Sequence, residues 1–333
     1  MSDLAVVAFA AETGSHLLRA PREQRFAKFA ATFDEDAYRT RLAETGIRWL
    51  ARDDPGFPAR LRAIHDPPLG LFLRGNGGVE LLHGSTVSIV GARACSSYGE
   101  EVATSFARAA ARAGVVVVSG MARGIDAAAH RGALDSVASD NGITVAVLGC
   151  GIDRDYPSSH AALAVRIAER GLVVSEYPPG VEPAPWRFPA RNRIVAGLAT
   201  VTVVVEARER SGALITADLA LEEGREVLAV PGEITSALSH GTNSLLRIGA
   251  TPATCVADVL EALGVDPAAA ATTTELEPRL AAVHAAVVDA AATADDLVRR
   301  TGFDAAQVAA ALAELELLGL VAQAEGRYRG VMG

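Results

Sequence analysis

Lysine is nearly absent from this chain: Lys28 is the only one among 31 basic residues, so almost every cation is an arginine. A site for anions would therefore offer planar, forked guanidinium donors. Aromatic residues make up 5% of a chain that is 50% hydrophobic, so the core must consist mainly of alanine, valine and leucine. The net charge of −9 argues only weakly against nucleic acid as a partner, because a basic groove can lie on an acidic protein.

Cysteines and long apolar runs are also scarce. Cys95, Cys150 and Cys255 are widely spaced and form no CxxC pair, which fits reduced thiols in a cytoplasm better than disulfides or a zinc site. No apolar run approaches the roughly 20 residues that span a bilayer, so we expect no membrane association. The chain has no phosphate loop and no metal-ligand spacing. The sequence therefore predicts neither a metal nor an organic cofactor.

The length of 333 residues is too great for one average domain. In the central part, short apolar runs alternate with helical stretches. Strands are expected at 87–90, 115–118, 144–148, 172–174, 201–205 and 226–229, and helices near 99–113, 125–134, 159–170 and 214–223. This alternation predicts an α/β fold with a doubly wound parallel sheet, in which ligands bind at the carboxyl ends of the strands.

The two ends of the chain differ from this central domain, 66–264. Residues 1–65 are expected to form a small helical domain of the helix-hairpin kind, followed by one short strand at 71–73. Residues 265–274 are rich in alanine and threonine and predict a linker. Residues 275–333 carry three helical segments and a short hairpin, which suggests a winged helix. Its last helix, 304–318, has no basic residue, so we do not expect it to read bases.

The loop after the second predicted strand has the features of an anion site. Ser119 and Gly120 end the strand, and Gly124 lets the backbone approach closely before a helix begins near Ile125. Free N–H groups and the positive end of the helix dipole would both point into this loop, and Arg123 adds a cation. A tight strand–helix turn with an incidental arginine explains the same residues.

Gly91 and Arg93 follow the first predicted strand, where a dinucleotide fingerprint would lie. The sequence there is not GxGxxG, and the second strand ends in Ser119 rather than in an acidic residue for a ribose hydroxyl. A nicotinamide or flavin dinucleotide is therefore disfavoured. Arg93 is suited to a phosphate, or is a plain surface arginine.

The most concentrated basic cluster follows Phe188. Arg191, Asn192 and Arg193 are consecutive, and the pattern predicts that a short helix begins at Ile194 just after them. Two forked donors, an amide and free backbone N–H groups would then lie together, while Phe188 offers a stacking face for an unpaired base. A solvated turn explains two arginines easily but the whole set poorly.

Ser211 and Gly212 follow the fifth predicted strand and precede an apolar helix with Thr216 in its first turn, which forms another small-residue cradle for anions. Several strand ends thus present Gly, Ser, Arg or Asn to one rim. A rim of such elements favours an extended polyanion over a single phosphate.

Asp126 and His130 are the candidates for catalysis. They lie four residues apart on one helical face and could act as acid and base. An acidic residue in a first turn is more often a cap, and such a histidine is more often packed or hydrogen-bonded. Nothing in the sequence requires catalysis.

These motifs together resemble those of the DprA/Smf family, the DNA-processing proteins of bacterial transformation. The similar segments lie in order within residues 45–260: 89–93, 119–126 with His130, 149–153 with Tyr156 and Pro157, 175–176, 188–193, 211–216, 231–232, 241–243 and 249–250. The two ends of the chain look like the family's variable helical domain and its winged-helix domain. The resemblance implies an extended Rossmann-like fold that acts as a dimer, binds and protects single-stranded DNA without sequence preference, and loads the RecA recombinase onto it.

The resemblance also implies the residues of a DNA site. Phosphates would be bound by Arg93, Arg123, Arg191 and Arg193, and the pocket would be lined by Gly91, Ser119, Gly120, Gly124, Asn192, Ser211 and Gly212. The stacking face and the small-residue cradle described above add Phe188 and Thr216 to this predicted site. Arg123 stands where many members have lysine, which keeps the charge but changes the donor geometry. No motif marks a surface for RecA.

Three hypotheses for the function remain. The first is a non-enzymatic DNA-binding and recombinase-loading protein. The second is a nucleotide-processing enzyme, because related folds include the nucleoside monophosphate phosphoribohydrolases. That family has the motif Pro-Gly-Gly-x-Gly-Thr-x-x-Glu, whereas the comparable loop here, 209–216, lacks the paired glycines and the catalytic glutamate. The third is an interaction scaffold with a vestigial pocket, and the sequence favours the first.

Overall fold

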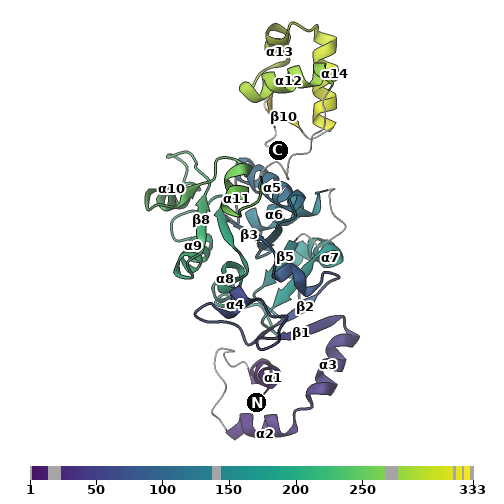
Figure 1. Cartoon of the computed structure of the whole chain (residues 1–333), viewed down its shortest axis with the longest axis vertical. Coiled ribbons are helices and arrows are strands. Elements are labelled where there is room, and N and C mark those ends of the chain that lie inside the picture. The colour runs from purple at the N-terminus through teal and green to yellow at the C-terminus, as the bar shows by residue number, and fades with distance from the viewer. Residues whose placement is uncertain are drawn as a thin grey trace. The chain divides into compact units, whose positions relative to one another are not determined.

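A computed structural model of the chain describes residues 2–13, 24–136, 144–266, 277–317, 320–324 and 326–330 (Figure 1). The chain forms two compact units, Met1–Ala270 and Ala271–Gly333. Most of the predicted linker, 265–274, lies outside the described residues. Each unit has a hydrophobic core of its own.

The first unit is built around a nine-stranded sheet with the strand order β1-β2-β6-β5-β4-β3-β7-β8-β9. The strands are β1 (Ile47–Ala51), β2 (Gly70–Arg74), β3 (Thr86–Val90), β4 (Val116–Ser119), β5 (Thr144–Leu148), β6 (Leu172–Ser175), β7 (Val201–Val204), β8 (Glu226–Ala229) and β9 (Thr251–Pro252). From β6 to β9 all neighbours pair in parallel. The six predicted strands, and the doubly wound parallel sheet that they imply, are confirmed.

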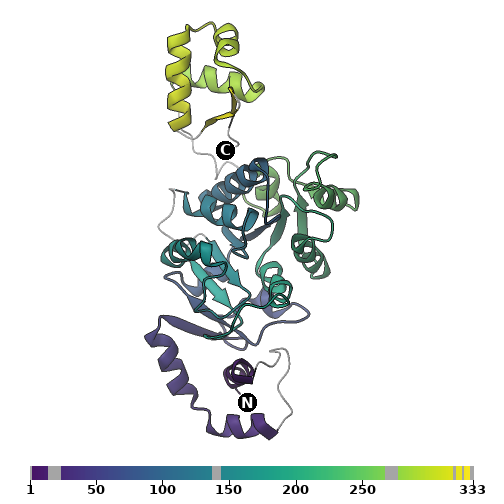
Figure 2. The ribbon, with the colours of Figure 1, turned by 180° about the vertical axis from the view of Figure 1, so that it is seen from behind.

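Helices cover both faces of this sheet, as the two opposite views show (Figures 1 and 2). They are α4 (Ala59–Arg62), α5 (Ser97–Arg112), α6 (Ile125–Leu134), α7 (Ala161–Arg170), α8 (Arg187–Leu198), α9 (Gly212–Glu222), α10 (His240–Arg247) and α11 (Val256–Ala262). Side chains alternate along each strand: Val117 packs with α5 and α6, while Val116 and Val118 pack with α8 and α9. Strands buried on both faces explain the unbroken valine runs.

The amino-terminal region corrects one expectation. Helices α1 (Asp3–Thr13), α2 (Gln24–Thr32) and α3 (Glu35–Glu44) form its helical part. However, β1 pairs antiparallel with β2, which pairs antiparallel with β6, so residues 47–51, which lie within the predicted helical domain 1–65, form the edge of the sheet. Trp49 of β1 packs on Phe72 of β2 with the ring centroids 4.6 Å apart. The short strand predicted at 71–73 is part of β2.

The second unit contains α12 (Pro278–Asp289), α13 (Ala294–Thr301), α14 (Ala305–Leu317) and a hairpin of β10 (Val321–Ala324) and β11 (Arg327–Gly330). This is the predicted winged helix. Gln307 on α14 accepts the backbone N–H of Asp304 at its Oε1, at 3.1 Å, and its own backbone N–H donates to the carboxylate of Asp304 at 2.8 Å. Across the described part of the chain, no helix combines the length and apolar character needed to cross a bilayer.

Candidate nucleic-acid interface

The site lies where the strand order reverses, between β3 and β7. In open α/β sheets, ligands bind in the crevice at the carboxyl ends of the strands beside such a reversal. Two adjoining cavities of about 230 and 380 Å³ open there. Both are lined by Arg93, Gly120, Ala122, Phe188 and Arg191, so together they form one groove.

The loop after β3 is fixed at both of its ends. A Cβ on Gly91 would lie 2.6 Å from Cγ1 of Ile125, so only glycine fits against α6. At the other end the buried carboxylate of Glu206 accepts hydrogen bonds from the backbone N–H of Ser96, at 2.9 Å, and from its hydroxyl. Between these anchors Arg93 is exposed and lines both cavities.

Buried groups shape the first half of the loop after β4. Ser119 is fully buried and donates to the carbonyl of Ile89 at 2.7 Å, so it joins β4 to β3 and does not line the groove. Gly120 lines the groove; a Cβ there would lie 2.4 Å from Nη2 of Arg191. The carboxylate of Asp126 accepts the N–H of Gly120 at 3.1 Å and so holds the loop against the helix.

The second half of this loop places Arg123 at the groove. Gly124 has a φ of +74°, and a Cβ there would lie 2.2 Å from the carbonyl oxygen of Ala92. Met121 also has a positive φ, +57°, although it is not glycine. A strained backbone of this kind persists where surrounding contacts enforce it, often at binding sites. Arg123 is exposed between these residues and lines the larger cavity.

Helix α8 corrects the predicted start at Ile194. It begins at Arg187, so the polar trio Arg191–Arg193 lies inside the helix and not before it. The cause is that Arg191 takes a place in the buried stripe with Ile194, Val195 and Leu198, at helical spacing. A prediction from apolar residues alone does not count a buried arginine as part of the helix, so it places the start of α8 at Ile194 and not at Arg187.

Arg191 is buried at the floor of the groove. Its Nη1 donates to the carbonyl of Gly120 at 2.7 Å and to that of Val147. Burial lowers the pKa of Arg191, and the carboxylate of Asp126 opposes this shift. Asn192 donates from its amide to the carbonyl of Gly212 at 3.1 Å, which ties α8 to the start of α9. Both residues line the smaller cavity.

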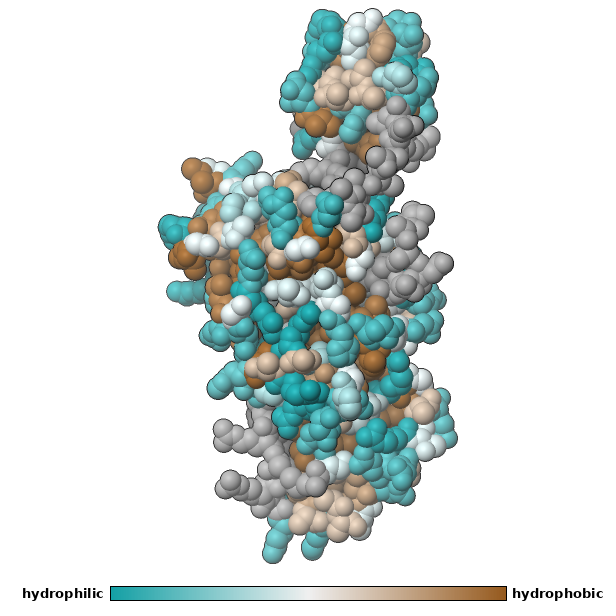
Figure 3. Space-filling view, viewed as in Figure 1, coloured by the Kyte–Doolittle hydropathy of each residue, from teal (hydrophilic) through white to brown (hydrophobic). Residues whose placement is uncertain are grey.

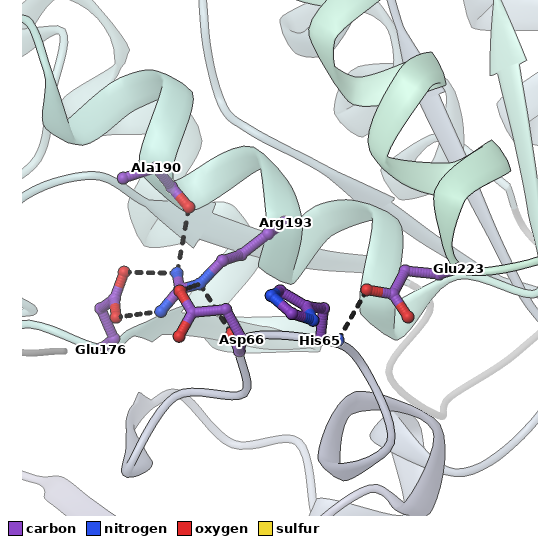
Figure 4. A network of polar contacts seen from close by, with 6 residues as sticks. All are labelled: His65, Asp66, Glu176, Ala190, Arg193 and Glu223. Atoms are coloured by element: carbon purple, nitrogen blue, oxygen red, sulfur yellow. Dashed lines mark hydrogen bonds and ion pairs between the residues drawn. The ribbon is translucent and has the colours of Figure 1, made fainter. Parts of the chain in front are cut away.

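Arg193 lines neither cavity and instead points toward Glu176 and Asp66 (Figure 4). It forms a fork with Glu176, with both N–O distances 2.8 Å, and its Nε lies 3.0 Å from a carboxylate oxygen of Asp66. Burial acts to lower the pKa of Arg193, but the charge and hydrogen bonds of Glu176 outweigh it and raise the pKa. The adjacent His65 donates its N–H to Glu223, so this network ties the segment before β2 to α8 and to the end of α9.

The start of α9 forms the far wall of the smaller cavity. Ser211 occupies the N-cap position without a capping hydrogen bond, and its buried hydroxyl has no partner within the described structure. Gly212 is exposed, with open space where a Cβ would lie. Thr216 is buried and donates to the carbonyl of Gly212 at 3.3 Å. The first turn of α9 therefore offers backbone N–H groups to the cavity.

Asp126 lines the smaller cavity, and His130 lies behind the groove; both are engaged in buried hydrogen bonds. Burial raises the pKa of Asp126, and Arg191 together with two backbone N–H groups opposes this. His130 is fully buried with Nδ1 2.7 Å from the hydroxyl of Thr144, and burial lowers its pKa to about 3, so it is neutral at physiological pH. His130 lines neither cavity, which does not suit it to proton transfer with a ligand.

Comparison with known proteins agrees with this arrangement. A family model described as DNA recombination-mediator protein A matches residues 48–264, and one described as DprA winged helix domain matches residues 267–327. The chain belongs to the DprA/Smf family. The putative DNA processing protein DprA of Mycobacterium tuberculosis is 42% identical over 307 residues, covering 86% of this chain and 78% of the relative. Protein Smf of Escherichia coli is 37% identical over 304 residues, covering 86% and 80%.

Two solved DprA structures share the fold. The X-ray structure of the Streptococcus pneumoniae protein superposes with a TM-score of 0.64 at 36% identity, over 78% of this chain and 92% of that one. The structure of the Helicobacter pylori protein, described as giving insight into its single-stranded DNA binding mode, superposes with a TM-score of 0.57 at 31% identity, over 62% and 92%.

Two residues that shape or line the groove of this DprA-family chain were not predicted from the sequence as site residues. Glu206 anchors the loop that carries Arg93. Tyr156 lines the larger cavity and stacks on Phe188. Glu206 lies just after β7, and Tyr156 lies in the loop after β5, within a segment that resembles the family. Their positions at strand ends are the feature of the sequence that could have identified them. Nowhere in the described ranges do three or more metal-ligating side chains gather.

Proposed function

We propose that the chain binds single-stranded DNA in the groove without sequence preference, as a non-catalytic DNA-processing protein. The observation that carries this proposal is the pairing of two exposed arginines, Arg93 and Arg123, with an aromatic pair in one cavity. Cations that follow a backbone and rings that stack on bases are the two parts of a single-strand site. The single-stranded DNA binding mode described for the Helicobacter pylori protein supports the same activity by similarity.

The geometry of the groove supports an extended ligand. Its walls come from the loops after β3, β4, β5 and β7 and from α8, and the start of α9 adds backbone N–H groups. Such donors bind phosphate without reading sequence. Asp126 is an acidic group in the groove, and its carboxylate is turned to the N–H groups of Gly120 and Ala122.

The test is fluorescence anisotropy of a labelled oligonucleotide, titrated across salt concentrations. Arg93→Ala combined with Arg123→Ala should weaken binding and reduce the slope of log K against log salt by about 1.4, since each lost phosphate contact removes about 0.7. The matched control is Arg166→Ala on α7, an exposed arginine paired with Asp135 and outside both cavities. A double variant with the slope of the control would contradict the proposal.

The alternative, a nucleotide-processing enzyme, predicts turnover. The candidate acid and base, Asp126 and His130, are engaged in buried hydrogen bonds, which supports a non-catalytic role. Incubation of the whole chain with nucleoside monophosphates would decide between the two: release of free base would favour the enzyme.

We further propose that the chain forms a cytoplasmic homodimer that loads RecA. This proposal is based on its membership of the DprA/Smf family. Exposed apolar side chains on and near α9 and α10 support self-association: Ile215, Leu221, Ile234 and Ile248. Figure 3 shows apolar surface over these helices. Light scattering would give the mass in solution, and pull-down with purified RecA would test the partner.

A further inference from the structure

Tyr156 is the more exposed member of the aromatic pair in the groove. Its ring stacks on that of Phe188 with centroids 5.1 Å apart and an angle of 23° between the planes. Tyr156 is 43% exposed, whereas Phe188 is half-buried. An exposed tyrosine backed by a second ring presents a flat π face to solvent, on which a flat ligand can stack.

Phe188 has little free surface for a base. Tyr156 covers part of it, and the guanidinium carbon of Arg93 lies 5.7 Å from the centre of its ring. Its edge packs against the backbone at Gly149, where a Cβ would lie 3.0 Å from Cδ1 of Phe188. A base that stacked directly on Phe188 would have to displace one of these neighbours. Phe188 is therefore better suited to support Tyr156 than to meet the base itself.

The loop that carries Tyr156 is held rigidly before any ligand arrives. Asp155 forms a salt bridge with Arg74 of β2. Asp153 accepts the N–H of Gly180 at 2.9 Å, and the N–H of Gly151 donates to the carbonyl of Val181 at 2.8 Å. Side chains on a braced loop lose little conformational freedom on binding, so the ring is preorganised for a flat partner.

The larger cavity brings charges of the right sign to the ring. Arg93 and Arg123 line the same space as Tyr156, whose volume of about 380 Å³ is within the range of small-molecule sites. A nucleotide has a flat base and an anionic phosphate. Tyr156 suits the base, and the two arginines suit the phosphates on either side of it.

On this basis, and resting on the proposed function, we propose that Tyr156 is the side chain on which an unpaired base stacks in the groove. Stacking is tolerant of sequence because every base has a π face. In a duplex both faces of each base are covered by neighbouring pairs. Tyr156 therefore contributes to the preference for single strands, while Arg93 and Arg123 provide charge that either form of DNA can use.

The test measures the affinity of Tyr156→Leu, Tyr156→Phe and the unaltered full-length chain for a labelled single strand by fluorescence anisotropy. Tyr156→Leu keeps an apolar side chain without a π face, and we expect it to bind a single strand about tenfold more weakly, within the range for loss of one stacked base. The salt slope should not change, since no phosphate contact is lost. Tyr156→Phe keeps the ring and should bind like the unaltered chain.

Tyr98→Leu is the matched control, because Tyr98 is 47% exposed and lies outside both groove cavities. An abasic strand provides a second readout: the unaltered chain and Tyr156→Leu should bind it equally. Equal binding of Tyr156→Leu and Tyr98→Leu to the normal strand would overturn the proposal and leave the proposed function standing. Weaker binding of the abasic strand by Tyr156→Leu would also overturn it, since the loss would not involve a base. Failure of the unaltered chain to bind any single strand would overturn both.

Discussion

Two pairs of arginines, drawn from the same family motifs, have opposite surroundings in this protein. Arg93 and Arg123 lie on the loops after β3 and β4, exposed in the groove. Arg191 and Arg193 lie on α8 and are 4% and 9% exposed. Among the described residues, the guanidinium groups of the first pair form no hydrogen bond or ion pair with the protein, although that of Arg93 lies over the ring of Phe188. The second pair donates to carbonyls and carboxylates of the protein. Residue type and motif therefore do not distinguish the two pairs; burial and the number of protein partners do.

The exposed and the buried arginines are therefore suited to different roles. An exposed arginine adds charge that salt can screen, and it contributes little to folding. A buried arginine with a forked carboxylate fixes the position of α8, and with it the groove side chains of Phe188 and Asn192. The comparison predicts that changes in the exposed pair alter DNA binding, whereas changes in the buried pair alter stability first.

The largest expected effect is on stability, at Arg193. Arg193→Met leaves Glu176, itself 5% exposed, as a buried charge without its partner. Breaking a buried ion pair in this way costs about 3–5 kcal/mol, and chemical denaturation would measure the loss of unfolding free energy. Arg93→Met is the matched change in the exposed pair and should cost less than about 0.5 kcal/mol.

A double variant separates the loss of the pair from the loss of packing. Arg193→Met combined with Glu176→Leu removes both charges and should recover most of the stability. If Arg193→Met alone unfolds no more easily than Arg93→Met, the distinction between the two pairs is wrong.

Much of the fold could be read from the sequence, because buried parallel strands appear as valine runs such as 115–118. Two strands were not predicted from the sequence, each for a local reason. β1 reads Ile-Arg-Trp-Leu-Ala and is only partly buried at the edge of the sheet, and β9 is two residues long. The start of α8 was misplaced because Arg191 occupies a core position.

The surroundings of individual site residues were harder to predict. Arg193 meets Asp66, which lies 127 residues away in the sequence, and no spacing rule brings those two together. Likewise Glu206 reaches Ser96 across the sheet reversal. The sequence motifs predict a site at the strand ends where the two cavities open, but tertiary contacts decide which of its polar residues remain available to a ligand.

A moderate effect is expected from the buried histidine behind the groove. His130 has a pKa of about 3 in the fold, lowered by burial and then by Arg191, against 6.5 for a free histidine. Because the pKa of His130 is lower in the folded chain, only the unfolded chain takes up a proton as the pH falls below 6.5. The contribution of His130 to the free energy of unfolding is therefore fully present above pH 6.5 and is lost as the pH falls. Between pH 7 and 5 the loss should be about 2 kcal/mol.

His130→Asn provides the comparison, because asparagine does not titrate. The difference in denaturation midpoint between the unaltered chain and this variant should be smaller at pH 5 than at pH 7. This holds however much stability the substitution removes at neutral pH. Parallel pH profiles for the two proteins would show that His130 is not held neutral.

The smallest effect should come from replacing arginine by lysine in the exposed pair. Arg123→Lys keeps the charge at a site that needs no fork, so affinity for single strands should stay within about threefold and the salt slope should not change. Arg193→Lys is the matched change in the buried pair. There a lysine loses the two parallel bonds to Glu176 and the contact with Asp66, so the unfolding free energy should fall. A chain that tolerates lysine equally at both positions would show that the fork is not what fixes α8.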